Sequence, residues 1–424
     1  MKSSDTQMEL VRRYLGGEAT LEEARKLESM LAVDAQLRRD YLAYARVEAG
    51  LSSKVRPKLV KAAPRRSVWL SWRPLAAAAV VIGCGMAAWW QSTAVAIEVL
   101  AAKEVNFRSG DRLSCRTIEL EGGELTFRLS SGAVVDLAGP ASLALLSPMH
   151  VRLAGGQVTV DVGDQAKGFV VDTTTARVVD LGTRFGVSTG VATSTDVAVF
   201  GGSVEVYTLG ALADRKPDVK LVEGEAVRLD KSHAPTRLKM IRVGEGGQKL
   251  AAHSHADVVS GVTDNVIEDS FRGFYGLMRG GLAEGSPVYT SGHTRTWHSM
   301  PGETFPVELL GADVICTFSQ DRRQPDLEIS LMVERASDVF VMLDTRAAIP
   351  EWVQREFSDT GLHLRSGPWG VLPTPTGVEE NGYVTHAVWK KTVMQPGVVT
   401  LGSPESASGR MWTAMYGIAV KEHR

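Results

Sequence analysis

His253, His255 and Asp257 are the residues whose types and spacing come nearest to a metal-binding motif of a hydrolase. A catalytic metal site needs further ligands around the ion, and no other histidine follows directly. The surrounding segment is polar and contains several Gly residues, which favours solvated side chains in a linker. We therefore expect no metal site, no cofactor and no catalytic residue. A membrane-anchored hydrolase remains the alternative that these three residues would support.

Aromatic and charged side chains near the C-terminus point to sugar binding instead. An exposed Trp ring offers an apolar face to the C–H surface of a sugar. Trp352 and Trp369 are the main candidates, and Asp344 with Arg346 is a candidate hydrogen-bonding pair. Trp389 and Trp412 are further aromatic residues that could stack. Taken singly, each Trp is more often part of a core, and Asp344 with Arg346 can equally be an ordinary salt bridge.

The region that carries these residues, 264–424, shows short apolar or alternating runs that predict a β-sandwich. The runs lie at 313–318, 327–333, 339–343, 383–385 and 415–420. The order of the segments 339–346, 350–353, 357–361 and 396–402 resembles galactose-binding-like jelly-roll modules of secreted carbohydrate-active proteins. This resemblance implies a ligand-binding role rather than a catalytic one.

Residues 74–97 form an uncharged, mostly apolar run up to Ile97, long enough for a helix that crosses a bilayer. Trp residues flank the run at both ends, as in the two interfaces of a membrane. Basic residues precede the run, and no acidic residue occurs between Glu48 and Glu98. The positive-inside rule then keeps the N-terminal segment in the cytoplasm and puts everything after Glu98 outside the inner membrane.

The segment before this run predicts a small bundle of short helices at residues 1–53. Thr20 and Glu23 form a capping box for one helix. An apolar stripe contains Leu27, Leu31, Leu37 and Tyr41. So small a bundle has little core of its own, so contact with another protein would stabilise it.

From residue 98 to residue 230 the pattern changes to short strands separated by Gly-containing turns, which predicts an antiparallel β-sandwich or β-roll. The strand-like runs lie at 125–129, 133–137, 151–153, 157–162, 168–171 and 203–207. Turns are expected at residues 131–132, 155–156 and 201–202. In the Leu181–Phe185 step, Gly182 and Thr183 fit a tight bend that directs Phe185 into the core.

Several motifs in this region resemble the FecR family of periplasmic regulators, in the family's own order. The most specific piece is Leu-Gly-Thr-x-Phe at residues 181–185. The motif positions are Gly132, Arg152, Gly156, Leu181, Gly182, Thr183, Phe185 and Gly202. The resemblance implies a structural role for them, and it implies that the N-terminal helices bind an extracytoplasmic-function sigma factor while the external β-domain receives a signal.

Together these observations predict a multi-domain, single-pass inner-membrane signal transducer that is not an enzyme. Its expected parts are a helical sigma-binding domain (1–53), a basic linker (54–73), a membrane helix (74–97), a FecR-like β-domain (98–230), a linker (231–263) and a C-terminal β-sandwich (264–424). The formal net charge of -2 gives no reason to expect a nucleic-acid partner. The alternative is a membrane-anchored glycan-binding or adhesion protein without a signalling role.

The predicted topology can be tested with reporter fusions. A phosphatase reporter fused after Asp230 should be active and one fused at Ser53 inactive, because only the first would lie outside the membrane. Replacing Arg65, Arg66 and Arg73 with Glu should weaken this orientation. The opposite activity pattern would contradict the whole domain assignment.

Overall fold

The computed structural model describes Met30 and residues 94–189, 194–209, 216–230, 234–252, 257–266, 272–291, 294–319, 321, 324–369, 382–404 and 414–423. Apart from Met30, the expected helical domain, the basic linker and residues 74–93 of the expected membrane helix lie outside this set. No helix among the described residues is long and apolar enough to cross a membrane. The chain divides into two compact units, Met1–Ala78 and Ala79–Arg424, and every described residue except Met30 belongs to the second.

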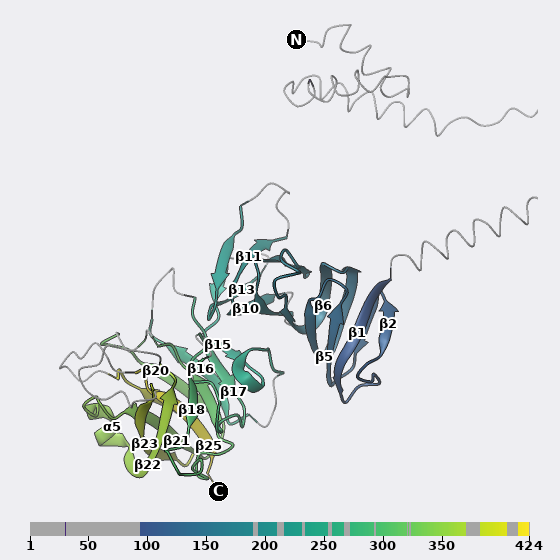
Figure 1. Ribbon diagram of the computed structural model, residues 1–424. Coiled ribbons are helices and arrows are strands. Elements are labelled where there is room, and N and C mark those ends of the chain that lie inside the picture. The colour runs from purple at the N-terminus through teal and green to yellow at the C-terminus, as the bar shows by residue number, and fades with distance from the viewer. Residues whose placement is uncertain are drawn as a thin grey trace, which may run out of the picture. The chain divides into compact units, whose positions relative to one another are not determined.

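The first β-module is one branched sheet made of the strands β1 to β14 (Figure 1). Its strands are β1 (Val95–Lys103), β2 (Arg112–Cys115), β3 (Thr117–Leu120), β4 (Glu124–Leu129), β5 (Val134–Ser147), β6 (His150–Asp161), β7 (Val170–Asp172), β8 (Ala176–Asp180), β9 (Arg184–Thr189), β10 (Thr195–Gly201), β11 (Ser203–Thr208), β12 (Val219–Val222), β13 (Ala226–Leu229) and β14 (Thr236–Arg237). The main path runs β12-β11-β8-β7-β6-β5-β4-β1-β2, and the branch β9-β10-β13-β14 leaves it at β6. All pairings are antiparallel except that of β6 with β7.

Alternation of apolar and polar residues explains why these segments are strands. In β4, Leu125, Phe127 and Leu129 are buried in the core of the module, whereas the residues between them are less buried. This period of two places every second side chain on the same face of a sheet. The expectation of a mainly β protein outside the N-terminal segment is confirmed.

Two local predictions are wrong. Residues 95–97, expected at the end of the membrane helix, belong to β1, where Val95 and Ile97 are buried and pair with β2. A short apolar run does not by itself distinguish a helix from a strand. The expected turn at residues 155–156 lies inside β6, where Gly156 has a φ of +92° and a Cβ atom on it would lie 2.5 Å from the carbonyl oxygen of Pro140.

The second β-module contains an eight-stranded and a three-stranded sheet, which pack on one core as a β-sandwich. The strand orders are β15-β17-β19-β25-β21-β23-β22-β18 and β16-β20-β24. The elements are β15 (Met240–Arg242), η1 (Glu245–Gly247), β16 (Val259–Asp264), β17 (Tyr275–Met278), β18 (Thr296–His298), β19 (Asp313–Cys316), β20 (Ile329–Val333), β21 (Ser337–Asp344), α5 (Glu351–Glu356), β22 (Ser358–Gly367), β23 (Val384–Val393), β24 (Gly397–Leu401) and β25 (Gly417–Glu422).

The expected linker at 231–263 is not a linker in its described part. It contributes β14 to the first sheet and β15 and β16 to the second module. Ile241, Val243 and Val259 from this segment are buried in the core of the second module. The prediction of a linker rested on the polar and Gly-rich composition of this segment. It failed because the apolar residues that enter the core are few and widely spaced and form no recognisable strand pattern.

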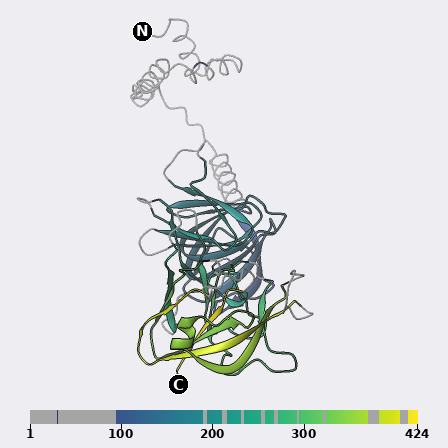
Figure 2. The ribbon, with the colours of Figure 1, turned by 90° about the vertical axis from the view of Figure 1, so that its left-hand side faces the viewer.

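The two β-modules share a core along β10. Val197 and Val199 face the core of the first module, whereas Ala198 and Phe200 belong to the core of the second. The ring of Phe200 meets that of Phe274 edge to face, with centroids 6.0 Å apart. In Figure 1, β10 and β13 lie next to β15 and its neighbours, and Figure 2 shows the blue and teal strands of the first module directly next to the green and yellow strands of the second. Both faces of β10 are therefore buried.

A buried ion pair supports the same contact. Arg237 of β14 donates two hydrogen bonds to the carboxylate of Asp264 in β16, at 2.9 Å and 2.7 Å. The Asp264 side chain is completely buried, and Arg237 also donates to the carbonyl oxygen of Gly273. Backbone hydrogen bonds join the modules as well, including one from the amide of Ala226 to the carbonyl oxygen of Arg272. We call this contact along β10, β13 and β14 the seam.

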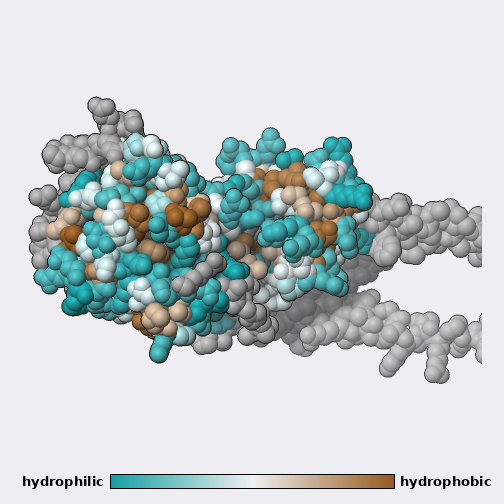
Figure 3. All heavy atoms as spheres, turned by 90° about the horizontal axis from the view of Figure 1, so that it is seen from below, coloured by the Kyte–Doolittle hydropathy of each residue, from teal (hydrophilic) through white to brown (hydrophobic). Residues whose placement is uncertain are grey.

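The face seen in Figure 3 is mostly hydrophilic, with separate apolar groups among the described residues. Among the exposed apolar residues are Met332 and Val398, a cross-strand pair of the three-stranded sheet that is 46% and 64% exposed. Scattered apolar residues of this kind are normal on soluble surfaces.

The shared core can be tested by truncating its central ring. Phe274→Ala should lower the free energy of unfolding by about 3–5 kcal/mol, because it removes a fully buried ring. Met332→Ala, at an exposed position, is the control and should cost less than about 1 kcal/mol. Denaturant unfolding of both variants measures this. Equal small losses would contradict a shared core.

Candidate functional site

The family-like motif at residues 181–185 forms the turn between β8 and β9 and is built around a buried carboxylate. Asp180, the last residue of β8, is completely buried. Its carboxylate accepts hydrogen bonds from the amide of Gly182 at 2.8 Å and from the hydroxyl of Thr183. Burial raises the pKa of Asp180 to about 6, although the neighbouring amides and Lys167 act against this rise. The sequence analysis missed Asp180, whose one signal was its place directly before Leu-Gly-Thr.

Two glycines fasten this turn to the start of β11. Gly182 and Gly202 have φ values of +102° and +79°, which L-residues with side chains rarely adopt. A Cβ atom on Gly202 would lie 2.5 Å from the carbonyl oxygen of Gly182. The amide of Leu181 donates to the carbonyl oxygen of Ser203 at 3.2 Å. The close approach of the two segments therefore requires glycine at 202.

The remaining motif positions also serve the first sheet. Phe185 is completely buried in the core of the module, whereas Leu181 is 42% exposed. Gly132, with a φ of +94°, lies in the turn between β4 and β5, and Arg152 is exposed on β6. These residues shape the strands and turns of the module rather than a pocket with reactive groups.

The structure gives Trp352 contacts typical of a scaffold residue. Its indole N–H donates to the carbonyl oxygen of Ser403 at 2.9 Å. Its ring meets those of Phe357 and Tyr416 edge to face, with centroids 5.6 Å and 5.8 Å apart. A partly buried ring held on several sides offers little free face for stacking on a sugar.

Trp369 is held in a similar way. Its indole N–H lies 3.0 Å from both the carbonyl oxygen and the hydroxyl of Ser366. The ring meets Tyr289 edge to face at 5.8 Å, and the guanidinium of Arg295 lies 4.7 Å from the ring centroid. The Arg295 side chain thus occupies a position that a ligand would need.

Asp344 and Arg346 form a local ion pair that fixes the chain after β21. Arg346 donates from both its guanidinium and its backbone amide to the carboxylate, at distances of 2.6 Å to 3.2 Å. The amide of Ala414 adds a hydrogen bond at 2.8 Å. Burial opposes ionisation of Asp344, but these hydrogen bonds outweigh burial and lower its pKa. Its oxygens therefore already have donors from the chain itself.

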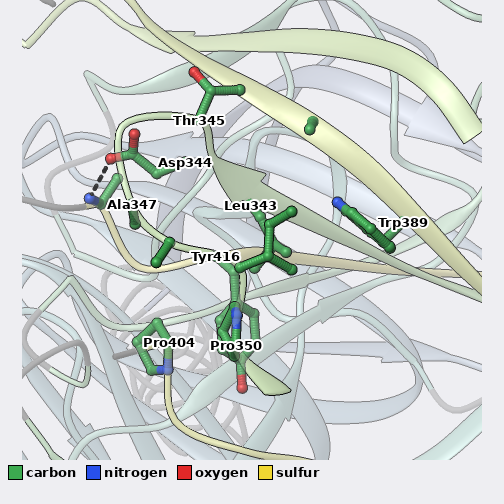
Figure 4. Close-up of a pocket in the computed structure, with 12 residues that line it drawn as sticks. Leu343, Asp344, Thr345, Ala347, Pro350, Trp389, Pro404 and Tyr416 are labelled. Atoms are coloured by element: carbon green, nitrogen blue, oxygen red, sulfur yellow. Dashed lines mark hydrogen bonds between the residues drawn. The ribbon is translucent and has the colours of Figure 1, made fainter. Parts of the chain in front are cut away.

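A cavity of about 180 Å³ lies beside this ion pair, at the end of β21, the middle of β23 and the residues before β25. In Figure 4, Leu343 and Tyr416 lie between Trp389 and the loop that carries Asp344. The lining is mostly apolar and includes Ala347, Ala348, Ile349, Pro350, Ala387, Pro404 and Ala414. The indole N–H of Trp389 is buried and has no hydrogen-bond partner among the described residues. Trp389, one of the four Trp residues proposed to contact sugar, thus lines this cavity, and Trp412 lies outside the described residues.

A serine and a histidine come together in the core of the second module. The hydroxyl of Ser366 lies 2.8 Å from Nε2 of His386, and both side chains are completely buried. Nδ1 of His386 lies 3.4 Å from the carbonyl oxygen of Met342. Burial lowers the pKa of His386 to about 4, against the attraction of Asp344. This pair therefore joins β22 to β23 and is closed to a substrate.

The expected solvated motif around residue 257 is only partly described. His253 and His255 lie outside the described residues, whereas Asp257 is buried and accepts a hydrogen bond from Arg242 at 2.9 Å. Among the described residues, no group of three or more His, Cys, Asp or Glu side chains is placed to hold a metal ion. Asp257 is thus the partner of an arginine inside the second module.

One further expectation from the sequence concerns contacts with a partner protein. The expected sigma-factor contacts Leu27, Leu31, Leu37 and Tyr41 lie outside the described residues. Cys115 and Cys316 are both free thiols, and burial raises the pKa of Cys316 to about 12.

Comparison with known proteins identifies one part of the chain. Residues 115–205 match the family model described as FecR protein. This range contains every motif position of the sequence analysis from Gly132 to Gly202. A search of curated proteins gives no match.

The solved structures found are only distantly similar. Two structures of a candidate anti-sigma factor from Parabacteroides distasonis ATCC 8503 are 24% and 23% identical to this chain, with TM-scores of 0.23 and 0.24. Each similarity covers 28% of this chain and 56% of the other, so this chain spans little more than half of those structures. A β-glucuronidase of glycoside hydrolase family 2 is 11% identical, covers 78% of this chain and 36% of its own, and has a TM-score of 0.31. TM-scores this low support no inference about function.

The buried His386 predicts a loss of stability in mild acid. Its pKa is about 4 in the folded state against 6.5 for an unperturbed histidine, so between these pH values the unfolded chain binds a proton that the folded chain does not. The free energy of unfolding should therefore fall by up to about 3 kcal/mol from pH 6.5 to pH 4 on account of this residue.

The measurement compares the wild type with His386→Gln by denaturant unfolding over this pH range. The difference in free energy of unfolding between wild type and His386→Gln should shrink as the pH falls. The exposed control His363→Gln should show the same pH dependence as the wild type. Asp180 acts in the opposite direction, because its raised pKa makes the folded state the better proton binder between pH 3.8 and about 6. Because the wild type and His386→Gln both contain Asp180, its contribution cancels in the difference between their free energies of unfolding. A constant difference would show that His386 is not held neutral.

Proposed function

We propose that this chain, whose residues 115–205 belong to the FecR family, is a membrane-anchored signal transducer that regulates an extracytoplasmic-function sigma factor. The observation that carries the proposal is the FecR domain itself, together with the apolar run that precedes it. In this proposal residues 1–53 hold the sigma factor in the cytoplasm. The two β-modules lie outside the inner membrane and respond to an external ligand or partner.

The first β-module begins in a way that suits this role. Strand β1 starts at Val95, within the last three residues of the apolar run, and pairs with both β2 and β4. Val95, Ile97 and Val99 are buried in the core of the module. An anchor that enters a sheet without an intervening linker passes a displacement of the sheet on to the membrane segment.

The seam supports a sensor role for the second β-module. Phe200 and Ala226 are buried in its core, and the ion pair of Arg237 with Asp264 joins the two modules. Because the modules share a core, a ligand that changes the packing of the second module also changes the free energy of the first. Such coupling is what a transducer needs.

For the external ligand, a glycan remains the proposal. The cavity lined by Trp389, Tyr416 and Asp344 fits this role better than the faces of Trp352 and Trp369, because those two rings already contact other side chains. Arg346 would act by holding Asp344 in place. A glycan-binding protein without a signalling role is the alternative, and the presence of a bound sigma factor distinguishes the two.

The test is capture of a sigma factor by the tagged full-length chain in detergent. The wild type should retain an extracytoplasmic-function sigma factor, and Leu31→Asp should lose it, because an unpaired charge in a desolvated contact costs several kcal/mol. Arg25→Ala is the matched control in the same segment and should retain it. A folded wild-type chain that captures no sigma factor would contradict the transducer proposal and favour the glycan-binding alternative.

A further inference from the structure

A short loop of the second β-module reaches back onto the sheet of the first, at a place separate from the seam. The loop comprises residues 244–250, between β15 and β16, and we call it the clasp. It is closed at its base by hydrogen bonds from the amide of Gly244 to the carbonyl oxygen of Lys249 at 2.9 Å and from the amide of Ala251 to that of Arg242 at 3.0 Å. It is therefore a formed element with a fixed base.

Leu250 is the residue of the clasp that enters the first module. Its backbone amide donates to the hydroxyl of Thr159 in β6 at 2.9 Å, and Thr159 is only 3% exposed. Its side chain covers Gly186 of β9 so closely that a Cβ atom there would lie 2.5 Å from Cγ of Leu250. Thr126, Asp136 and Gln157 line the adjoining depression. The absence of a side chain at 186 thus makes the seat for the leucine.

Two polar contacts flank this seat. Arg184, the variable position of the Leu-Gly-Thr-x-Phe motif, donates to the side-chain oxygen of Gln248 and also pairs with Asp161. Lys249 lies 3.4 Å from Glu124, and these side chains are 36% and 51% exposed. Exposed ion pairs of this kind contribute little to stability. The clasp therefore depends on one leucine, on the hydrogen bond from its amide to the buried Thr159 and on a few solvent-accessible polar contacts. The seam, by contrast, has a buried core and a buried ion pair.

A groove of about 740 Å³ runs along the other side of the clasp. Its lining includes Gly244, Glu245 and Gly246 from the clasp, Lys103 and Glu124 from the first module, and Arg279 and Glu284 from the second. Gly246 and Gly247 have φ values of +76° and +70°, so the loop has the backbone freedom of glycine at its tip. A molecule in this groove would touch the clasp directly.

We propose that the clasp is a regulatory contact that docks reversibly on the FecR domain, with Leu250 in the seat above Gly186. Release of the clasp frees the motif residue Arg184 from Gln248 and opens the depression on β4, β5, β6 and β9, while the seam stays closed. Local opening of a protein takes place where its contacts are least stable. The role of release in signalling rests on the proposed function; the docking itself does not.

The test uses Gly186→Val in the full-length chain, followed by hydrogen exchange. The new side chain occupies the seat of Leu250, and valine suits a strand position whose backbone is not left-handed. Amides of residues 244–251 should exchange roughly tenfold faster, whereas the seam amides of Ala226 and Phe274 should stay unchanged. Gly155→Val in β6, where nothing lies within 4 Å of the added Cβ, is the control and should match the wild type.

Thr159→Val is the second variant, since it removes the acceptor of the Leu250 amide and keeps the shape of the side chain. It should speed exchange at Leu250 in the same direction. Unchanged exchange of the clasp in both variants, or equal acceleration of the seam, would overturn the proposal of a reversible clasp.

The signalling role is measured separately, with a reporter of sigma-factor activity in cells. Gly186→Val should shift reporter output away from the resting level, and Gly155→Val should not. A released clasp with unchanged output, in a chain that still captures its sigma factor, would contradict the regulatory role of the clasp alone. Failure of capture in the wild type would instead contradict the proposed function.

Discussion

The structure depends on the burial of both faces of β10. A strand at the branch of a sheet leaves one apolar face without a cover, and here the second β-module supplies it. Ala198 and Phe200 on that face belong to the second core, whereas Val197 and Val199 belong to the first. Because burial of apolar area is the main favourable term in folding, the two modules stabilise each other. The position of the second module follows from this requirement.

Buried charges fix the ends of the strands. Asp264 pairs with Arg237 across the seam, Asp344 with Arg346 beside the cavity, and Asp180 holds the turn of the family motif. A buried carboxylate without partners would cost several kcal/mol, so each one selects the loop conformation that supplies its donors. These buried carboxylates therefore stabilise loops and strand ends and do not form a reactive site. Free surface for a ligand lies instead in the apolar cavity near Trp389 and in the groove along the clasp.

The contacts between the modules differ in strength, and this difference has a functional meaning in a transducer. The seam combines an aromatic contact, a shared core and a completely buried carboxylate. The clasp adds a single leucine above Gly186 and an ion pair that water reaches. A protein with one strong and one weak contact between two domains can change their coupling without losing its fold. Strand β1 connects the first of these domains directly to the apolar run.

Much of the local structure could be predicted from the sequence, because strand period and turn chemistry are properties of neighbouring residues. The alternation in 125–129 and 203–207, the turn at Gly132 and the Leu-Gly-Thr-x-Phe motif all indicated a FecR-like β-domain. The strand at residues 197–200 was not among the expected ones, and no local pattern says what covers a strand that is buried on both faces.

Tertiary structure alone decided the rest. Thr159 and Leu250 are 91 positions apart, and Arg237 and Asp264 are 27 apart. Trp352 and Trp369 were candidates for sugar stacking, although a single Trp is more often part of a core, and their rings are packed in the fold. The segment expected to be a linker carries core residues of the second module. Side-chain pattern reports which face of an element is apolar, but the partner of that face depends on how distant segments pack in three dimensions.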